Sequence, residues 1–117
     1  MRRKKRTEVL IKEGGSLAAE IAEAVRSSHR VVELQPPQEG LVMVKLREQA
    51  RNSLFYLGEV LVTESKARID GCPGLGLVRG HDEELARDLA VIDAAWAARV
   101  EGVDEWERWI SDAEEDL

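Results

Sequence analysis

Apolar residues near the start of the chain recur every three or four positions, which is the spacing of an amphipathic helix. A short helix is predicted around residues 9–11, with Thr7 as its cap and Gly14-Gly15 ending it. A second helix is expected from Ser16, as N-cap, to about residues 27–28. One apolar stripe runs along that second helix: Leu17, Ala18, Ile21, Ala22 and Val25.

The middle of the chain changes to extended patterns, in which apolar and polar residues alternate or β-branched residues gather. Extended segments are predicted at residues 31–35, 41–47, 54–69 and 75–78. In the second of these, Val42, Val44 and Leu46 share one face, opposite Lys45 and Arg47. Pro36-Pro37 prevents a helix after the first segment, and the polar residues 48–52 predict a hairpin turn. Connections this short make the sheet antiparallel.

Helical spacing returns after Asp82, a predicted N-cap. The apolar seam of this helix is Leu85, Leu89, Ile92 and Trp96. Gly102 marks a break, and Asp104 with Glu107 resembles a capping box that opens a last helix. We therefore predict one α+β domain over residues 1–117, with N-terminal helices, a central antiparallel sheet of about four strands and two C-terminal helices.

Charge narrows the classes of function. The 117 residues include 17 basic and 23 acidic side chains, a net charge of −6, which argues against a nucleic-acid binder. Residues 1–6 form a basic arm and residues 101–117 an acidic helix; they are either solvated ends or a dipole that steers a partner. The absence of a long apolar run predicts no membrane span, and the lone Cys72 suits the reducing cytoplasm.

Residues suited to catalysis do not form a recognisable set. His29 and His81 lie far apart in sequence, and Cys72 has neither a neighbouring base nor a second cysteine. No catalytic residue and no metal site is therefore predicted. Arg79 and His81 precede a helix N-terminus, which can hold an anion, although Asp82 would cap the same N–H groups.

Three glycines superficially resemble a phosphate-binding loop: Gly74, Gly76 and Gly80. A dinucleotide fingerprint needs a strand before it and a helix directly after it. Here a predicted strand occupies the middle of the pattern, so turns and close strand packing are the favoured roles.

Glu59 is a carboxylate within an apolar alternation. Strict alternation places five residues on one face: Phe55, Leu57, Glu59, Leu61 and Thr63. A bulge at Gly58 or a salt bridge would resolve the conflict, and the alternative is contact with a partner or ligand.

Trp106 and Trp109 are three residues apart and so lie on nearly the same helical face. Burying both in a small domain is difficult, and an exposed aromatic stripe is typical of association. We therefore expect a partner interface there, with burial of both indoles in the core as the alternative.

Four ordered blocks resemble the PhnG family, the G subunit of the bacterial carbon–phosphorus lyase system. They lie at residues 39–42, 55–64, 76–82 and 90–95, and the resemblance covers about residues 16–100. The most specific features are Leu-Gly-Glu-Val-Leu-Val-Thr-Glu, the Val-Arg-Gly-His-Asp turn and the Ile-Asp-Ala-Ala helix. The chain departs from the family at Leu75, where an aromatic residue is common, and in a shorter C-terminal region.

The resemblance implies an accessory subunit that is not active alone. In that family the G subunit works with the core subunits H, I and J and an ATPase-like L subunit. Together they support transfer of the ribose triphosphate of ATP to methylphosphonate, with release of adenine. MgATP is then used by the complex, with no cofactor bound by this chain alone, and the isolated chain can self-associate.

Two other functions stay open from the sequence. One is a free-standing small-molecule-binding or regulatory domain, with a pocket lined by Glu59, Arg79 and His81. The other is a stand-alone hydrolase.

Overall fold

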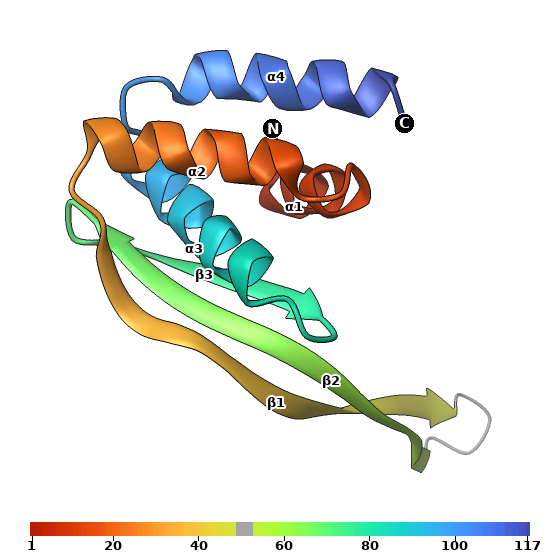
Figure 1. The fold of residues 1–117 in the computed structure, drawn as a ribbon. Helices are drawn as coiled ribbons and strands as arrows, with labels where there is room; N and C mark the ends of the chain where they lie inside the picture. The colour runs from red at the N-terminus through yellow and green to blue at the C-terminus, as the bar shows by residue number, and fades with distance from the viewer. Residues whose placement is uncertain (49–52) are drawn as a thin grey trace.

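The computed structural model describes the backbone of residues 1–48 and 53–117, and the side chains of residues 1–43 and 58–117. Its elements are α1 (Arg3–Lys12), α2 (Ser16–Ser28), β1 (Val32–Glu48), β2 (Ser53–Ile69), β3 (Cys72–Arg79), α3 (Glu83–Ala98) and α4 (Val103–Glu115). The helices lie on one side of the sheet, with α3 against the strands and α4 farthest from them (Figure 1). The predicted α+β class is confirmed. The part of the chain described has no helix with the length and apolar character needed to cross a membrane.

Over the described residues the sheet is antiparallel in the order β1-β2-β3 and contains three strands, where about four were predicted. The difference arises at Pro36-Pro37. The extended segments on either side of these prolines form the single strand β1, and its pairing with β2 shifts register between Gln35 and Gln38. Because β1 is an edge strand, a residue without an N–H is tolerated there. The predicted turn at residues 48–52 falls mostly outside the described residues.

Helix α3 packs directly on the backbone of β3. A Cβ at Gly76 would lie 1.9 Å from the Ala86 carbonyl oxygen, and one at Gly74 would lie 2.2 Å from the Ala94 nitrogen. Only glycine permits this approach. The close-packing role predicted for these two glycines is confirmed.

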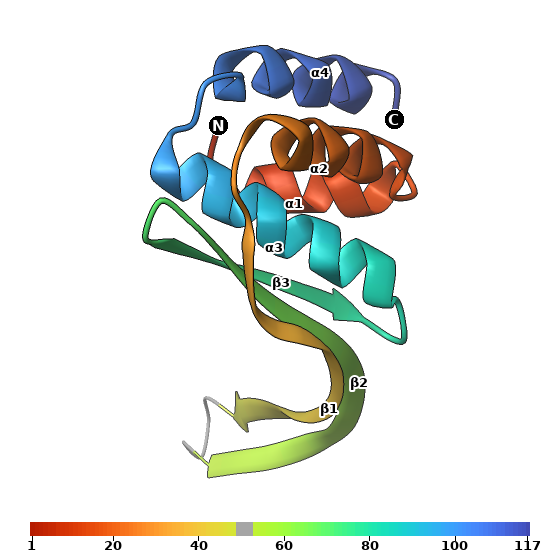
Figure 2. The same ribbon diagram turned by 60° about the vertical axis from the view of Figure 1, so that its left-hand side comes forward.

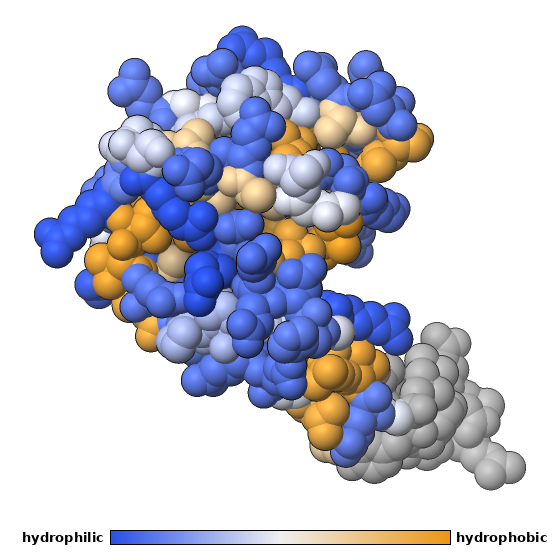
Figure 3. Space-filling view, viewed as in Figure 1, coloured by the Kyte–Doolittle hydropathy of each residue, from blue (hydrophilic) through white to orange (hydrophobic). Residues whose placement is uncertain are grey.

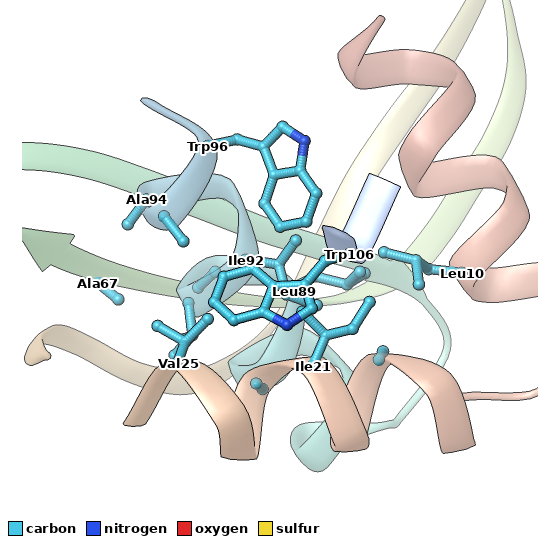
Figure 4. Packing of buried hydrophobic residues seen from close by; sticks show 14 of the residues in the cluster. Leu10, Ile21, Val25, Ala67, Leu89, Ile92, Ala94, Trp96 and Trp106 are labelled. Atoms are coloured by element: carbon cyan, nitrogen blue, oxygen red, sulfur yellow. The ribbon is translucent and has the colours of Figure 1, made fainter. Parts of the chain in front are cut away.

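The core lies among the four helices and the side of the sheet that faces them. The predicted stripe of α2 is buried at Ala18, Ile21, Ala22 and Val25, with Leu17 half-buried at its edge. Side chains from the other helices converge on this stripe (Figure 4). Those labelled there include Leu10, Leu89, Ile92 and Trp106. The seam predicted for α3 is confirmed, because Leu89, Ile92 and Trp96 are buried and Leu85 is half-buried against the core.

The predicted basic arm is part of a helix. Because α1 begins at Arg3, Thr7 lies inside the helix and is not its cap. Lys5 Nζ lies 2.7 Å from the Glu114 carboxylate of α4, and the Met1 amine lies 3.3 Å from Glu107. The basic and acidic ends of the chain therefore partly neutralise each other within one molecule.

Two further predicted caps are wrong. Gly15, and not Ser16, is the N-cap of α2, and the Glu13 carboxylate accepts from the Leu17 N–H at 2.6 Å. Gly102, and not Asp104, is the N-cap of α4. Both glycines have positive φ, a conformation that side-chain caps rarely adopt.

Candidate functional site

Strands β1 and β2 continue beyond β3 as a projecting ribbon, which we define as residues 41–48 and 53–61. Strand β3 pairs with β2 only from Val62 to Ile69, so the remainder of β2 pairs with β1 alone. The ribbon curves away from the helices, which do not cover its end (Figure 2). A two-stranded ribbon is marginal by itself in water.

Apolar side chains are exposed where the ribbon leaves the body of the molecule. The exposed fractions are 64% for Leu41, 47% for Val42, 52% for Met43 and 39% for Leu61. Apolar residues also gather there in the space-filling view (Figure 3). Successive residues of a strand point to opposite faces, so Leu41 and Met43 lie on one face and Val42 on the other. Apolar surface on both faces of an uncovered ribbon is typical of an association site.

Glu59 lies on this ribbon, directly after a β-bulge. Val44 pairs with Gly58, whereas Lys45 pairs with Tyr56, so β2 holds one extra residue; Gly58 has a φ of 139°. The bulge predicted at Gly58 is confirmed. Glu59 itself pairs with Met43 and is exposed, because it lies beyond the helices that cover Thr63. Its carboxylate therefore carries no burial cost in this chain. The side chains of Phe55 and Leu57 lie outside the described residues.

Arg79 lies on the other face of the sheet from Glu59. It ends β3, pairs with Val62 and is exposed, whereas the preceding Val78 is buried toward the helices. Glu59 shares the helix-facing side with Thr63, four residues along the strand. The structure therefore does not bring Glu59 and Arg79 into one pocket.

His81 is exposed in the turn between β3 and α3. Its Nδ1 contacts the Glu39 carboxylate of β1. Hydrogen bonding to Glu39, with the attraction of that negative charge, raises the pKa of His81 above its usual range. The Glu39 contact was not predicted, because nothing local in the sequence relates two residues on different elements.

A buried threonine fixes this turn. Thr63 Oγ1 donates to the Gly80 carbonyl at 2.6 Å and accepts from the Asp82 N–H at 3.2 Å. Asp82 Oδ1 accepts from the Leu85 N–H at 3.1 Å, so the predicted cap is confirmed. The Leu85 N–H, one of the groups at the start of α3 that could hold an anion, is thus already bonded within the chain.

The predicted aromatic stripe of α4 is not exposed as expected. Trp106 is only 5% exposed, and its ring centroid lies 6.1 Å from that of Trp96. The indole points into the core among the helices (Figure 4), so the expectation of an exposed Trp106 is wrong. Trp109 is half-buried at the edge of the core. A partner contact at Trp109 stays a prediction.

Clusters of metal-binding side chains are absent from the described residues: no three His, Cys, Asp or Glu side chains come together in a way that could hold an ion. His29 Nε2 lies 3.4 Å from the Glu101 carbonyl oxygen, and Cys72 is a half-buried free thiol.

Together these features define the class: a small α+β domain with helices on one side of an antiparallel sheet and an uncovered apolar ribbon beyond it. The family model described as phosphonate metabolism protein PhnG matches residues 1–117. The chain therefore belongs to the PhnG family, and its place is in phosphonate metabolism. Comparison with curated proteins gave no match.

Proposed function

We propose that this chain is an accessory subunit of the carbon–phosphorus lyase system. In this proposal it supports transfer of the ribose triphosphate of ATP to methylphosphonate, with release of adenine. The partners are the H, I and J subunits and the ATPase-like L subunit, MgATP is used by the complex, and the complex works in the cytoplasm. Family membership supports the metabolic setting.

The projecting ribbon is the observation that supports a role as a subunit. Its exposed apolar residues include Leu41, Val42 and Met43, and covering such side chains is worth about 25 cal/mol for each Å² removed from water. The described helices of this chain lie elsewhere, over the body of the sheet. A partner that covers the ribbon would both bury these residues and hold a strand pair that is marginal alone.

The free-standing binding domain receives no comparable support. That hypothesis expected Glu59, Arg79 and His81 to line one pocket. Glu59 and Arg79 lie on opposite faces of the sheet, and His81 pairs with Glu39.

The test is co-purification of the tagged chain with the H, I and J subunits of its own organism, followed by assay of ATP-dependent transfer to methylphosphonate. The decisive variant is Leu41→Ser/Met43→Ser. Leu117→Ser is a matched control, since Leu117 is 60% exposed at the end of the chain and far from the ribbon in sequence.

We expect the ribbon variant to fold normally and to lose co-purification, whereas the control assembles. Assembly of the ribbon variant at wild-type yield would show that the ribbon is not the interface. Full transfer activity of the partners without this chain would overturn the accessory role itself.

A further inference from the structure

A groove of about 670 Å³ lies where α1, the end of α3 and strand β3 meet. Four basic residues line it, Arg3, Arg6, Lys66 and Arg99, against one acidic residue, Asp93. This is the reverse of the chain as a whole, whose net charge is −6. The volume is in the usual range for a small-molecule site.

The single carboxylate of the groove is already bonded within the chain. Asp93 accepts from Arg6 at 2.7 Å, from Arg3 at 2.8 Å and from the Leu75 N–H at 2.8 Å. Asp93 therefore positions two guanidinium groups on one side of the groove. The Arg3 side chain remains 61% exposed and can still donate to a ligand.

Arg99 adds a cation from an unusual backbone position. It is the C-cap of α3 and has φ 55° and ψ 44°, the left-handed conformation in which glycine is the common residue. Among the described residues, six glycines have positive φ, and the other two positions are Asp70 and Arg99. A strained non-glycine residue that lines a groove indicates a role for its side chain.

Apolar residues form the remainder of the lining, including Leu34, Leu75 and Pro73. Trp96 also lines the groove, but its ring is already in contact with other residues. The Arg6 guanidinium lies over it, 5.2 Å from the ring centroid, and the Trp106 ring packs against it. The groove thus offers cations beside an apolar wall, and no free aromatic face for stacking a base.

Two larger ligands fit poorly. A peptide strand adding to the edge of β3 would need the Leu75 N–H, which donates to Asp93. A nucleic acid would meet a chain with a net charge of −6.

We propose that this groove binds a small phosphate-bearing anion with two or more negative charges. Arg3, Lys66 and Arg99 contact its oxygens, because guanidinium and ammonium groups are the side chains that bind phosphate. Arg6 and Asp93 act as positioning residues. The inference goes beyond the accessory role and holds for the isolated chain whether or not it assembles.

The test is titration of the full chain with tripolyphosphate, inorganic phosphate, ribose 5-phosphate or sulfate at constant ionic strength, followed by amide NMR shifts and calorimetry. Arg99→Gly is the decisive variant, since it removes the cation and suits the left-handed backbone. Arg108→Ala, on the exposed face of α4 and outside the groove, is a control with the same change in net charge.

We expect shifts centred on Leu75, Ala97 and Arg99, and binding weakened about tenfold or more by Arg99→Gly at an unchanged or raised Tm. Arg108→Ala should bind like the wild type. Tighter binding of ribose 5-phosphate than of tripolyphosphate would identify a sugar phosphate as the ligand class, and the reverse order a polyphosphate. Either order supports the site.

The proposal is overturned if none of the phosphate probes binds at millimolar concentration, if sulfate binds as tightly as they do, or if the two variants weaken binding equally. Failure of the accessory role would be seen separately, because the ribbon variant Leu41→Ser/Met43→Ser retains this groove and should bind the probe normally.

Discussion

Arg6 and Asp93 form an ion pair that is almost withdrawn from solvent and joins α1 to α3. The Nη2–Oδ1 distance is 2.7 Å, and the two side chains are 5% and 13% exposed. Burial lowers the pKa of the Arg6 guanidinium, while the hydrogen bond and charge of Asp93 raise it. Arginine stays protonated at neutral pH, and Asp93 is the carboxylate that accepts a hydrogen bond from its buried guanidinium.

We predict that Asp93→Ala lowers the free energy of unfolding by about 3–5 kcal/mol, because it leaves a buried cation unpaired. It also removes the acceptor of the Leu75 N–H. Urea denaturation followed by tryptophan fluorescence measures the loss. The matched control is Glu33→Ala, whose partner Arg87 lies 3.1 Å away in a largely exposed pair. That change should cost less than about 1 kcal/mol. Equal losses in the two variants would contradict a special role for Asp93.

The contact of α3 with β3 gives a second prediction. Gly76→Ala should destabilise the fold by about 1–3 kcal/mol or more, because its Cβ would collide with the backbone of α3 at Ala86. Gly40→Ala is the control, since nothing lies within 4 Å of its added Cβ and its φ is not positive. Thermal unfolding by circular dichroism compares them. A Tm for Gly76→Ala equal to that of Gly40→Ala would show that the helix moves away at little cost.

Much of this fold was predictable because its signals are local. The stripe of α2 depends on residues three and four apart, and the long strand β2 on alternation within one segment. The bulge at Gly58 was also predictable, since a carboxylate beside a glycine within an apolar alternation points to it.

The remaining features depend on residues far apart in the chain. Arg6 was expected in a solvated arm because its partner, Asp93, lies 87 positions away. Trp106 was expected on the surface, yet it packs in the core against Trp96 of α3, a contact between two different helices. The basic groove was missed for the same reason, because Lys66 and Arg99 belong to different elements.

The contact between His81 and Glu39 predicts a pH dependence. Because the pKa of His81 is raised above 6.5 in the folded chain, its contribution to stability is complete below about pH 6.5 and is lost as the pH rises through the folded value. Glu39→Gln should lower that pKa toward its usual range, as measured by NMR titration of the imidazole protons. Glu23→Gln makes the same charge change on the exposed side of α2 and should leave the His81 titration unaltered. A titration unaffected by Glu39→Gln would rule out the pairing.

Asp88 predicts a pH dependence from burial of a carboxylate. Burial destabilises the ionised form of Asp88 in the folded chain. Burial raises its pKa, and the hydrogen bond from Arg26, at 3.0 Å, only partly counters that effect. The free energy of unfolding should therefore decrease as the pH rises from about 3.8 through the folded pKa, and level off above it. Asp88→Asn keeps an acceptor for Arg26 and should leave stability at pH 7 unchanged or about 1 kcal/mol higher.

Arg26→Ala tests the same ion pair by removing the group that donates to Asp88. Removing the guanidinium leaves the Asp88 carboxylate buried without its donor, so we expect a loss of about 1–2 kcal/mol at pH 7 and a further rise of the Asp88 pKa. In the Asp88→Asn background the same substitution should cost less than half as much, because no buried charge remains to be compensated. Urea denaturation of the four proteins at pH 4 and pH 7 completes the cycle. An equal cost of Arg26→Ala in both backgrounds would show that Arg26 stabilises the fold through packing of its side chain and not through the carboxylate.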